Sequence, residues 1–428
     1  MEDIGKVTAL INENPYSPDT YGLYLEALQE ELIFQYENNE MYRRFCERKS
    51  FNPYHKIESI AQIPPIAVSV FKELGFQLRS VPQEDIKLAL QSSATSGIPS
   101  TIVVDKITSK RQAKVMVKVI QDFIGKERKP FLVMDIDPRS ASRKLLGARF
   151  AAVTGYLNFA SKVGYFLKAD QNNVSYFDIE DMQRYVAEIS ADQPVVVFGF
   201  TYILYSNVLK SLQNQHIKIQ LPPNSKIIHI GGWKKLENET FFNSQLADSF
   251  GITPEDVIDI YGFTEQMGLN YPDCLCGCKH TSAYTDVVVR DVVTQEILEA
   301  GQEGRLEFVT PVPHSYPGNA VLTDDLGVIV AGDCPYGRSG KRFRVSGRLK
   351  KAEIRGCGDV LSNKLIFQKS NVKEEKEDCS LEIQYFRHEL PAANSPLESL
   401  RQIIDQLKNE QTWLSSQPIE ALIGLIGK

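Results

Sequence analysis

A run of hydroxyl-bearing residues lies directly before a β-branched stretch. Residues 92–100 read Ser-Ser-Ala-Thr-Ser-Gly-Ile-Pro-Ser, and Thr-Ile-Val-Val follows at 101–104. Small residues allow the backbone to approach an anion closely, and hydroxyl and N–H groups can donate to phosphate oxygens. The run lacks the glycine and lysine spacing of a P-loop, which disfavours a Walker-type nucleotide triphosphatase. Taken alone, the run also fits an ordinary polar surface loop.

Two further loops follow apolar strands. Gly231-Gly232 follows the run at 227–230, and Tyr-Gly-Phe-Thr-Glu at 261–265 follows the run at 257–260. Ligands of open α/β sheets bind beyond the carboxyl ends of the strands, so both loops are expected to face one crevice. A glycine pair permits a flat group to stack on the backbone, Thr264 can bond a phosphate, and Glu265 can hold Mg²⁺. Each loop alone is also consistent with an ordinary turn.

A carboxylate and a guanidinium occur later in the chain. Asp325 belongs to Thr-Asp-Asp at 323–325, and Arg348 belongs to Ser-Gly-Arg at 346–348. A ribose diol is matched by a carboxylate acceptor with a neighbouring arginine. As isolated features, both are also compatible with turns that carry ordinary charges.

Thiols and an imidazole gather at 274–280, and a further cysteine follows in the β-rich part of the chain. This set suggests a zinc site; its members are Cys274, Cys276, Cys278, His280 and Cys334. In an extended strand the ligands at 274–280 would spread over about 20 Å, so convergence requires a bend, which we expect at Gly277. Cys278 fits the role of spectator as well as that of ligand. The alternative is a set of reduced thiols near the active-site loop.

His229 lies two residues before Gly231. It could polarise a group in the crevice, although a histidine near a strand end is more often a structural residue with satisfied hydrogen bonds.

The elements that must position these residues follow from the apolar pattern. Short β-rich runs alternate with helical stretches, which indicates an α/β sheet covered on both faces. The expected strands are 101–104, 131–134, 195–198, 227–230 and 257–260, and the expected helices are 109–124 and 236–250. A long amphipathic helix from 17 to about 49 and a short helix near Phe71-Lys72 precede them.

The predicted secondary structure changes after about residue 282, where strands and turns replace helices. The expected strands are 286–289, 305–309, 320–322 and 342–345, which indicates a smaller antiparallel β subdomain. We expect a charged loop at 370–379 and a helix at 396–413. The predicted divisions are a helical part (1–85), an α/β core (86–281), a β-rich end of the core (282–369) and a charged linker with a helical tail (370–428).

Composition excludes several classes of protein. The 428 residues include 48 basic and 54 acidic side chains that are interspersed, which disfavours binding to nucleic acid. No apolar run approaches the roughly 18 to 20 residues that a membrane helix needs. Residues 1–6 lack the features of a secretion signal, and seven cysteines, three of them crowded together, fit a reducing compartment. We therefore expect a cytoplasmic protein.

The order of these blocks resembles the adenylate-forming superfamily of acyl and aryl ligases. Within it, the lysine-free loop at 92–100 and Gly-Gly-Trp-Lys-Lys at 231–235 look like the acyl-protein synthetase (LuxE-like) branch. So do Ile-Pro-Pro-Ile at 63–66 with Phe71-Lys72, and Phe-Gly-Phe-Thr at 198–201. The resemblance covers residues 15–362. Ala94 departs from the glycine that many relatives carry, which could narrow the loop.

The resemblance implies a large α/β domain, with helices around mixed sheets, that activates a carboxylic acid with ATP and Mg²⁺. The residues that would cradle the β- and γ-phosphates are Ser92, Ser93, Thr95, Ser96 and Gly97. Thr264 would contact the α-phosphate, Glu265 would bind Mg²⁺, Asp325 would hold the ribose hydroxyls, and Arg348 would contact ribose or phosphate. Tyr261-Gly262 and Gly231-Gly232 would frame the adenine and the acyl chain, and the substrate would be a fatty or other hydrophobic acid.

The same resemblance implies transfer of the acyl group to a cysteine and then to an acyl reductase, either a partner or a fused domain. Cys357 is the expected nucleophile because Gly356 and Gly358 leave its sulfur accessible and Arg355 favours the thiolate. Cys379, in an acidic stretch, is the weaker candidate. Two alternatives stay open: a CoA ligase resembling phenylacetate-CoA ligases, and a catalytically retired binding module. The apolar run at 421–428 could pack on the core or begin another domain.

Overall fold

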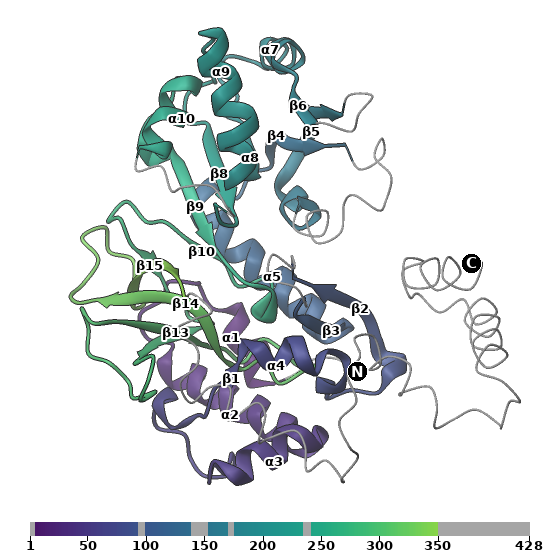
Figure 1. The fold of residues 1–428 in the computed structure, drawn as a ribbon, viewed down its shortest axis with the longest axis vertical. Helices are drawn as coiled ribbons and strands as arrows, with labels where there is room; N and C mark the ends of the chain where they lie inside the picture. The colour runs from purple at the N-terminus through teal and green to yellow at the C-terminus, as the bar shows by residue number, and fades with distance from the viewer. Residues whose placement is uncertain (1–4, 93–98, 138–152, 170–174, 234–240, 350–428) are drawn as a thin grey trace, which may run out of the picture. The chain divides into compact units, whose positions relative to one another are not determined.

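The computed structural model of the chain describes residues 5–92, 99–137, 153–169, 175–233 and 241–349 (Figure 1). The chain divides into one unit at 1–366 and a second at 367–428. The expected loop at 370–379 and the expected helix at 396–413 lie outside the described residues.

The larger sheet has seven strands in the order β10-β9-β8-β7-β4-β5-β6. Their bounds are β4 (Lys129–Ile136), β5 (Ala160–Ala169), β6 (Ser175–Phe177), β7 (Val196–Phe200), β8 (Lys226–Ile230), β9 (Val257–Tyr261) and β10 (Tyr271–Pro272). The five central strands pair in parallel, whereas β6 and β10 pair antiparallel at the two edges. Among the described residues, the structure thus confirms the four expected strands of this sheet and adds β5, β6 and β10.

Alternating residues of this sheet enter two separate cores. Leu132 and Met134 of β4 pack with the helices α7 (Ile179–Ala187) and α10 (Phe242–Phe250). Phe131 and Val133 face the opposite core, which contains the end of α5 (Lys106–Ile124). Because successive side chains of a strand point to opposite faces, a nearly continuous apolar run is what a sheet covered on both sides requires. The expected α/β architecture is confirmed.

A second sheet contains the later strands. Its order is β11-β15-β14-β13-β12, and β1 adds to β14 in parallel. The bounds are β1 (Ile66–Ala67), β11 (Lys279–His280), β12 (Asp286–Arg290), β13 (Glu303–Val309), β14 (Ala320–Val330) and β15 (Arg342–Arg348). The other pairings are antiparallel, as expected for the β-rich region. This sheet shares its core with the first helices and with a hairpin of β2 (Ile86–Gln91) and β3 (Thr101–Asp105).

The prediction of one helix from 17 to about 49 is wrong. The structure has α1 (Lys6–Asn12), α2 (Tyr21–Asn38) and α3 (Glu40–Arg48), and Asn39 separates the last two. Asn39 has extended backbone angles, and its side chain accepts a hydrogen bond from the N–H of Tyr42 at 2.9 Å. An asparagine in this position satisfies a free N–H of the next helix and so begins α3. The short helix near Phe71 is confirmed as α4 (Val68–Glu73).

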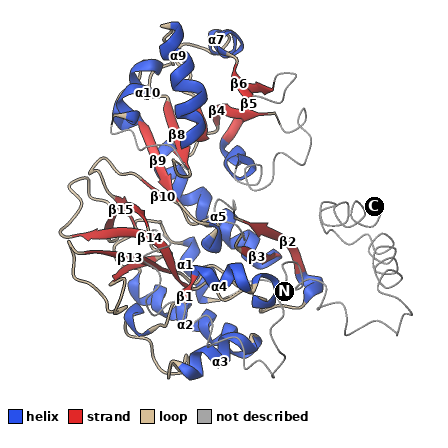
Figure 2. Ribbon diagram, viewed as in Figure 1, coloured by secondary structure: helices blue, strands red, loops and turns tan. Residues whose placement is uncertain are grey.

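The remaining helices are short. After β7 the chain forms α8 (Thr201–Ile203), a π-helical turn (Leu204–Leu209) and α9 (Lys210–Gln215) (Figure 2). Of the expected helix 236–250, the described part is α10, which begins at Phe242. Single 3₁₀ turns are η1 (Ile60–Gln62), η2 (Gly75–Leu78), η3 (Gln83–Asp85), η5 (Leu157–Phe159), η7 (Pro254–Asp256) and η8 (Thr264–Gln266). None of the helices among the described residues has the length and apolar character to cross a membrane.

Candidate functional site

The carboxyl ends of β8 and β9 lie side by side. The two strands pair in parallel, with Ile230 opposite Ile260, so their following loops leave the same edge of the sheet. Gly231 has φ +77°, and Gly231, Gly232 and Gly262 are exposed. Glycine adopts this backbone conformation without steric cost and leaves the peptide plane open. The edge therefore offers bare backbone on which a flat group can stack.

Tyr261, Asp325 and Arg348 form one group that joins the two sheets. Tyr261, the last residue of β9, donates its phenol proton to Asp325 Oδ2 at 2.7 Å. Asp325 lies opposite Arg348 in the β14–β15 ladder, and Arg348 Nε is 3.1 Å from Asp325 Oδ1. Pairing across adjacent strands brings the two residues together although they are distant in the sequence.

Burial determines the electrostatics of this group. The Asp325 side chain is 15% exposed, and burial raises the pKa of its carboxyl, while Arg348 and the Tyr261 phenol oppose that shift. Arg348 is 61% exposed, so solvent screens most of its effect. The result is a half-sequestered carboxylate that retains acceptor capacity for hydroxyl groups of a ligand.

Thr264 and Glu265 lie in the 3₁₀ turn η8, which is fastened to the second sheet. The Tyr316 hydroxyl donates to the Glu265 carbonyl at 2.9 Å, and Gln266 Nε2 donates to the carbonyls of Phe308 and Gly318 at 3.0 and 2.9 Å. The turn contacts β3, the strand that follows the hydroxyl-rich loop. Thr264 and Glu265 are therefore held in a turn that is fixed to the second sheet and lies against β3.

The Glu265 carboxyl is almost completely buried, at 3% exposure. Burial raises its pKa, and Ser100, Lys72 and Arg348 act in the opposite direction. Among hard cations, Mg²⁺ is bound by such carboxylate oxygens together with phosphate groups. Glu265 is thus the carboxylate of this turn that could hold a divalent cation.

The ends of the hydroxyl-rich loop are tied together. The Ser92 N–H donates to the Ser100 carbonyl at 2.9 Å, and the Ser100 N–H donates to Ser92 Oγ at 2.9 Å. The loop is thus the connection of the β2–β3 hairpin, directly before a buried strand. Four of its predicted phosphate ligands lie outside the described residues: Ser93, Thr95, Ser96 and Gly97.

Lys72 is a neighbour of this site to which the sequence analysis assigned no role. Its ammonium lies 3.7 Å from Asp324 Oδ2, and its charge influences Glu265. It projects from α4, which contacts both β3 and β14. The spacing of residues in the sequence could not predict a role for Lys72, because its partners come from distant elements. The sequence singled it out only as part of the Phe71-Lys72 pair that belongs to the family resemblance.

His229 is a structural residue. It is buried, and both ring nitrogens have partners: Nδ1 lies 2.9 Å from Thr201 Oγ1 and Nε2 lies 3.1 Å from Asn243 Oδ1. Asp259 Oδ1 is 3.3 Å from Nδ1. Burial lowers the pKa of the imidazole, in spite of the nearby Asp259. The histidine therefore supports the strand end that carries Gly231.

Four of the five suggested zinc ligands come together. The ligand atoms of Cys274, Cys276, His280 and Cys334 all lie within 4.8 Å of one another. Cys278 is buried but does not belong to this group. The expected nucleophile Cys357 and the alternative Cys379 lie outside the described residues.

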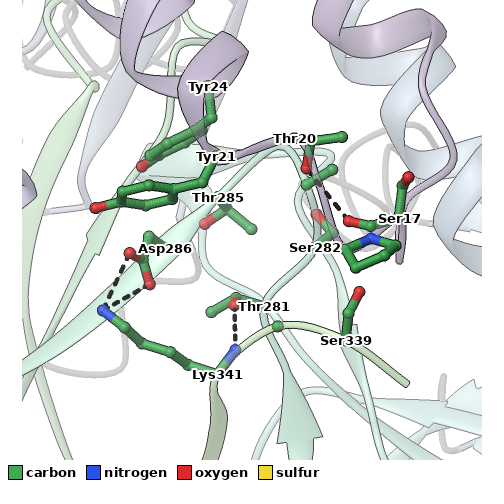
Figure 3. A pocket seen from close by; sticks show the side chains of 13 residues that line it. Ser17, Thr20, Tyr21, Tyr24, Thr281, Ser282, Thr285, Asp286, Ser339 and Lys341 are labelled. Atoms are coloured by element: carbon green, nitrogen blue, oxygen red, sulfur yellow. Dashed lines mark hydrogen bonds and ion pairs between the residues drawn. The ribbon is translucent and has the colours of Figure 1, made fainter. Parts of the chain in front are cut away.

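A small pocket lies apart from the Tyr261–Asp325–Arg348 group. It has a volume of about 180 Å³ and lies between the start of α2 and segments 281–286 and 339–341 (Figure 3). Figure 3 shows Lys341 pointing toward Asp286, with which it forms an ion pair at 2.9 Å. The pocket is smaller than typical ligand cavities of at least roughly 300 Å³, and no residue of the Tyr261–Asp325–Arg348 group lines it.

Comparison with known sequences identifies relatives over most of the chain. A family model described as "Acyl-protein synthetase, LuxE" matches residues 17–366. Two curated relatives are both named long-chain-fatty-acid–luciferin-component ligase. The one from Aliivibrio fischeri is 22% identical over 357 residues, which span 81% of this chain and 89% of that protein. The one from Vibrio harveyi is 24% identical over 343 residues, which span 77% and 84%.

Solved structures with a similar fold include 2-hydroxyisobutyryl-CoA ligase. Its postadenylation state, in complex with 2-HIB-AMP, aligns with a TM-score of 0.59 at 13% identity and covers 78% of this chain and 70% of that one. Its thioesterification state, with 2-HIB-AMP and CoA, also gives 0.59, at 15% identity, with coverage of 79% and 70%. At this level of identity the likeness establishes the fold, and the expected adenylate-forming architecture is confirmed.

Proposed function

The chain belongs to the acyl-protein synthetase (LuxE) family, and on this premise we propose that it activates a long-chain fatty acid with ATP and transfers the acyl group to its own Cys357. Family membership makes it an adenylate-forming ligase. The names of the two curated relatives include a long-chain fatty acid and so support a fatty acid as substrate. The family description, acyl-protein synthetase, supports a protein as acceptor.

The observation that carries the proposal is the Tyr261–Asp325–Arg348 group at the carboxyl edge of β9. Asp325 would accept hydrogen bonds from the ribose hydroxyls, and the Arg348 guanidinium would meet ribose or phosphate. The exposed backbone of Gly231-Gly232 and the Tyr261 ring would frame the adenine and the start of the acyl chain. Ser92 and the rest of its loop would receive the β- and γ-phosphates, with Thr264 at the α-phosphate.

The metal that this reaction implies fits the site. Glu265 presents a buried carboxylate whose ionised form a divalent cation would stabilise, in the turn that also carries Thr264. Mg²⁺ bound there would neutralise charge on the phosphates of ATP. Lys72 would add a positive charge to the same region.

The proposed chemistry has two half-reactions. An oxygen of the fatty-acid carboxylate attacks the α-phosphorus of ATP, the bond from that phosphorus to the bridging oxygen breaks, and pyrophosphate leaves. The Cys357 thiolate then attacks the acyl carbonyl carbon, and AMP leaves with the electrons of the broken carbon–oxygen bond. Both steps depend on alignment and charge neutralisation more than on a strong base. The thioester would next pass to an acyl reductase.

Adenylation is tested first by fatty-acid-dependent exchange of pyrophosphate into ATP. The wild-type chain should catalyse exchange with a long-chain saturated acid, and Asp325→Asn should reduce it at least about tenfold. Cys357→Ser should retain exchange because the thiol acts only in the second half-reaction. The absence of exchange and of AMP release with every acid in a chain-length series would contradict the proposal and favour a retired binding module.

Acyl transfer is tested with a labelled fatty acid and ATP, with and without CoA. Label should bind to the protein, be released by hydroxylamine, and disappear in Cys357→Ser. Cys379→Ser serves as the matched control and should keep the label. Formation of acyl-CoA without protein-bound label would replace the self-acylation step with a CoA ligase activity and leave the adenylation step intact.

A further inference from the structure

Three thiols and one imidazole lie together where the two sheets meet, away from the nucleotide site. We propose that Cys274, Cys276, His280 and Cys334 bind one structural Zn²⁺ ion. The sequence contains five candidates, and the fold selects four of them: two from the segment after β10, one from β11, and one from the connection between β14 and β15. Cys₃His is an established ligand set for structural zinc.

The distances match the edges of a zinc tetrahedron. With zinc–sulfur bonds of about 2.3 Å and zinc–nitrogen bonds of about 2.0 Å, two sulfurs lie about 3.7 Å apart and a sulfur and a nitrogen about 3.5 Å apart. Cys274 Sγ is 3.8 Å from Cys334 Sγ, and Cys276 Sγ is 3.4 Å from His280 Nε2. All four atoms lie within 4.8 Å of one another, so closure requires only about 1 Å of side-chain movement.

A tight turn brings the first two cysteines and His280 to one point. The Gly277 N–H donates to the Cys274 carbonyl at 2.8 Å, and the Cys274 N–H donates to the Cys278 carbonyl at 2.9 Å. Gly277 has φ +71°, which glycine adopts without strain. The predicted bend at Gly277 is therefore present, and it reverses the chain so that Cys276 and His280 face the same side.

The histidine is oriented for coordination through Nε2. His280 Nδ1 donates to the Ser339 carbonyl at 3.3 Å, which leaves the Nε2 lone pair toward Cys276. Such a hydrogen bond to the second nitrogen fixes the tautomer of zinc-bound histidines. The Ser339 segment is itself held, since the Lys341 N–H donates to Thr281 Oγ1 at 2.9 Å (Figure 3).

A cation balances the charge of the proposed centre. Three thiolates and one Zn²⁺ carry a net charge of −1, and Arg338 Nη1 donates to Cys274 Sγ at 3.2 Å. Arg338 also pairs with Asp122 of α5 and lies over the rings of Phe123 and Tyr16, at 4.1 and 4.7 Å from their centroids. This fixed guanidinium supplies the outer contact that stabilises ligating thiolates.

The ligand chemistry selects zinc over other metals. Thiolates and imidazole are too soft for Mg²⁺ or Ca²⁺, which take oxygen ligands. Sulfur separations near 3.8 Å fit a single ion, whereas an iron–sulfur cluster interposes several atoms between its cysteines. The ion would hold the segment that leads from β10 of the larger sheet to β11 of the second sheet against the β14–β15 connection, and so would stabilise the junction between the sheets.

The test measures metal in the full chain. Purified without chelators, the protein should contain about one zinc per chain by elemental analysis. Replacing Cys274, Cys276 or Cys334 with serine should lower zinc content about tenfold or more, and Cys278→Ser, the matched control within the same turn, should leave it unchanged. Cobalt exchanged into the wild-type chain should give the visible absorption of a tetrahedral thiolate site.

A second readout does not require that the variants fold. Alkylation of the wild-type chain, mapped by mass spectrometry, should spare Cys274, Cys276 and Cys334 until a chelator strips the metal, while the reactivity of Cys46 stays unchanged. Zinc below about a tenth of an equivalent after incubation with a zinc salt would overturn the proposal. So would iron in place of zinc, or a disulfide between Cys274 and Cys334 in the metal-free protein purified under reducing conditions.

Discussion

The phenol of Tyr261 and the carboxylate of Asp325 are 64 residues apart in the sequence and 2.7 Å apart in the structure. The contact orients the carboxylate on which the proposed ribose site depends. A hydrogen bond to a charged group in a partly buried position contributes about 1.5 to 3 kcal/mol. Removing the phenol should therefore be detectable in nucleotide binding even though the ring stays in place.

We predict that Tyr261→Phe raises the KM for ATP about tenfold to a hundredfold and changes kcat little, because the lost contact is made equally in the ground and transition states. The measurement is steady-state release of pyrophosphate. Tyr54→Phe is the matched control: its phenol also lies 2.7 Å from a carboxylate, that of Glu37, but the residue is 53% exposed and is not part of the Tyr261–Asp325–Arg348 group. Equal KM values in both variants would contradict the role of Tyr261.

Glu307 of β13 gives a prediction of pH dependence. The side chain is completely buried, and burial raises its pKa from 4.5 to about 7, although Arg290 and Lys341 oppose the shift. Between these two values the folded chain binds more protons than the unfolded chain, so stability falls as the pH rises from about 4.5 to about 7. The loss is at most about 3 kcal/mol.

Glu307→Gln cannot titrate and should lack this component. We predict that the thermal midpoint of the wild-type chain, relative to that of Glu307→Gln, declines as the pH is raised from 5 toward 8. Other groups titrate in both proteins, so taking the difference between the two thermal midpoints removes their contribution. If the difference in thermal midpoint between the two proteins is constant, or grows in favour of the wild type at higher pH, Arg290 keeps Glu307 ionised throughout.

At the residue scale, sequence reasoning could name single residues but not their partners. Gly277 was predictable as a bend because only a turn could bring its neighbours together, and that bend is present. That Cys334 and not Cys278 completes the group depends on the β14–β15 connection, which local spacing does not describe. The sequence analysis assigned no role to Lys72 for the same reason: α4 contacts β14 only through tertiary packing.

At the scale of elements, the strands of the larger sheet that were predicted from the sequence are central strands buried on both faces. The β4 and β7 runs are uninterrupted apolar stretches and were predicted from them. β5 (Ala160–Ala169) was not predicted, because it contains Lys162, Gly164 and Lys168 and is buried only near its end. The apolar run from 195 onward opens with β-branched residues, which predicts a buried strand that changes into another element, and the structure places that change from β7 to α8 after Phe200.

The break between α2 and α3 was also missed, since apolar periodicity continues across it. Asn39 caps α3, and its side-chain Nδ2 donates to the Arg79 carbonyl at 3.1 Å and to Ser80 Oγ at 3.3 Å. We predict that Asn39→Ala lowers the unfolding free energy by about 1 to 3 kcal/mol, the sum of a lost cap and lost buried hydrogen bonds. Denaturant unfolding measures the change.

The neighbouring Asn38 offers the control for this change. It is exposed, and its side chain bonds only the Phe34 carbonyl within its own helix in the part of the chain that is described. Asn38→Ala should stay within about 0.5 kcal/mol of the wild type. If both variants lost the same stability, helix propensity and not the cap at Asn39 would account for the effect.

At the scale of the described unit, the site exists only while the two sheets keep their places. Tyr261 ends β9 of the seven-stranded sheet, whereas Asp325 and Arg348 belong to β14 and β15 of the other. Lys279 of β11 joins the sheets directly: its buried ammonium lies 2.9 Å from Asp259 of β9 and 2.9 Å from Asp273. A cation in this position is stabilised by both carboxylates, and its removal leaves them facing each other.

We predict that Lys279→Met lowers the unfolding free energy by roughly 2 to 4 kcal/mol and also raises the KM for ATP, because β9 and its Tyr261 lose their tie to the second sheet. The cost stays below that of a fully buried pair because the Asp259 and Asp273 side chains are 34% and 38% exposed. Lys218→Met removes an ion pair with Asp248 in which both side chains are about two-thirds exposed, and should change stability by at most about 0.5 kcal/mol. Denaturant unfolding and pyrophosphate release are measured on the same preparations.

A Lys279→Met protein that is destabilised but has a normal KM for ATP would mean that the nucleotide site does not depend on this junction. A Lys279→Met protein that matches Lys218→Met in both measurements would mean that other contacts hold the junction.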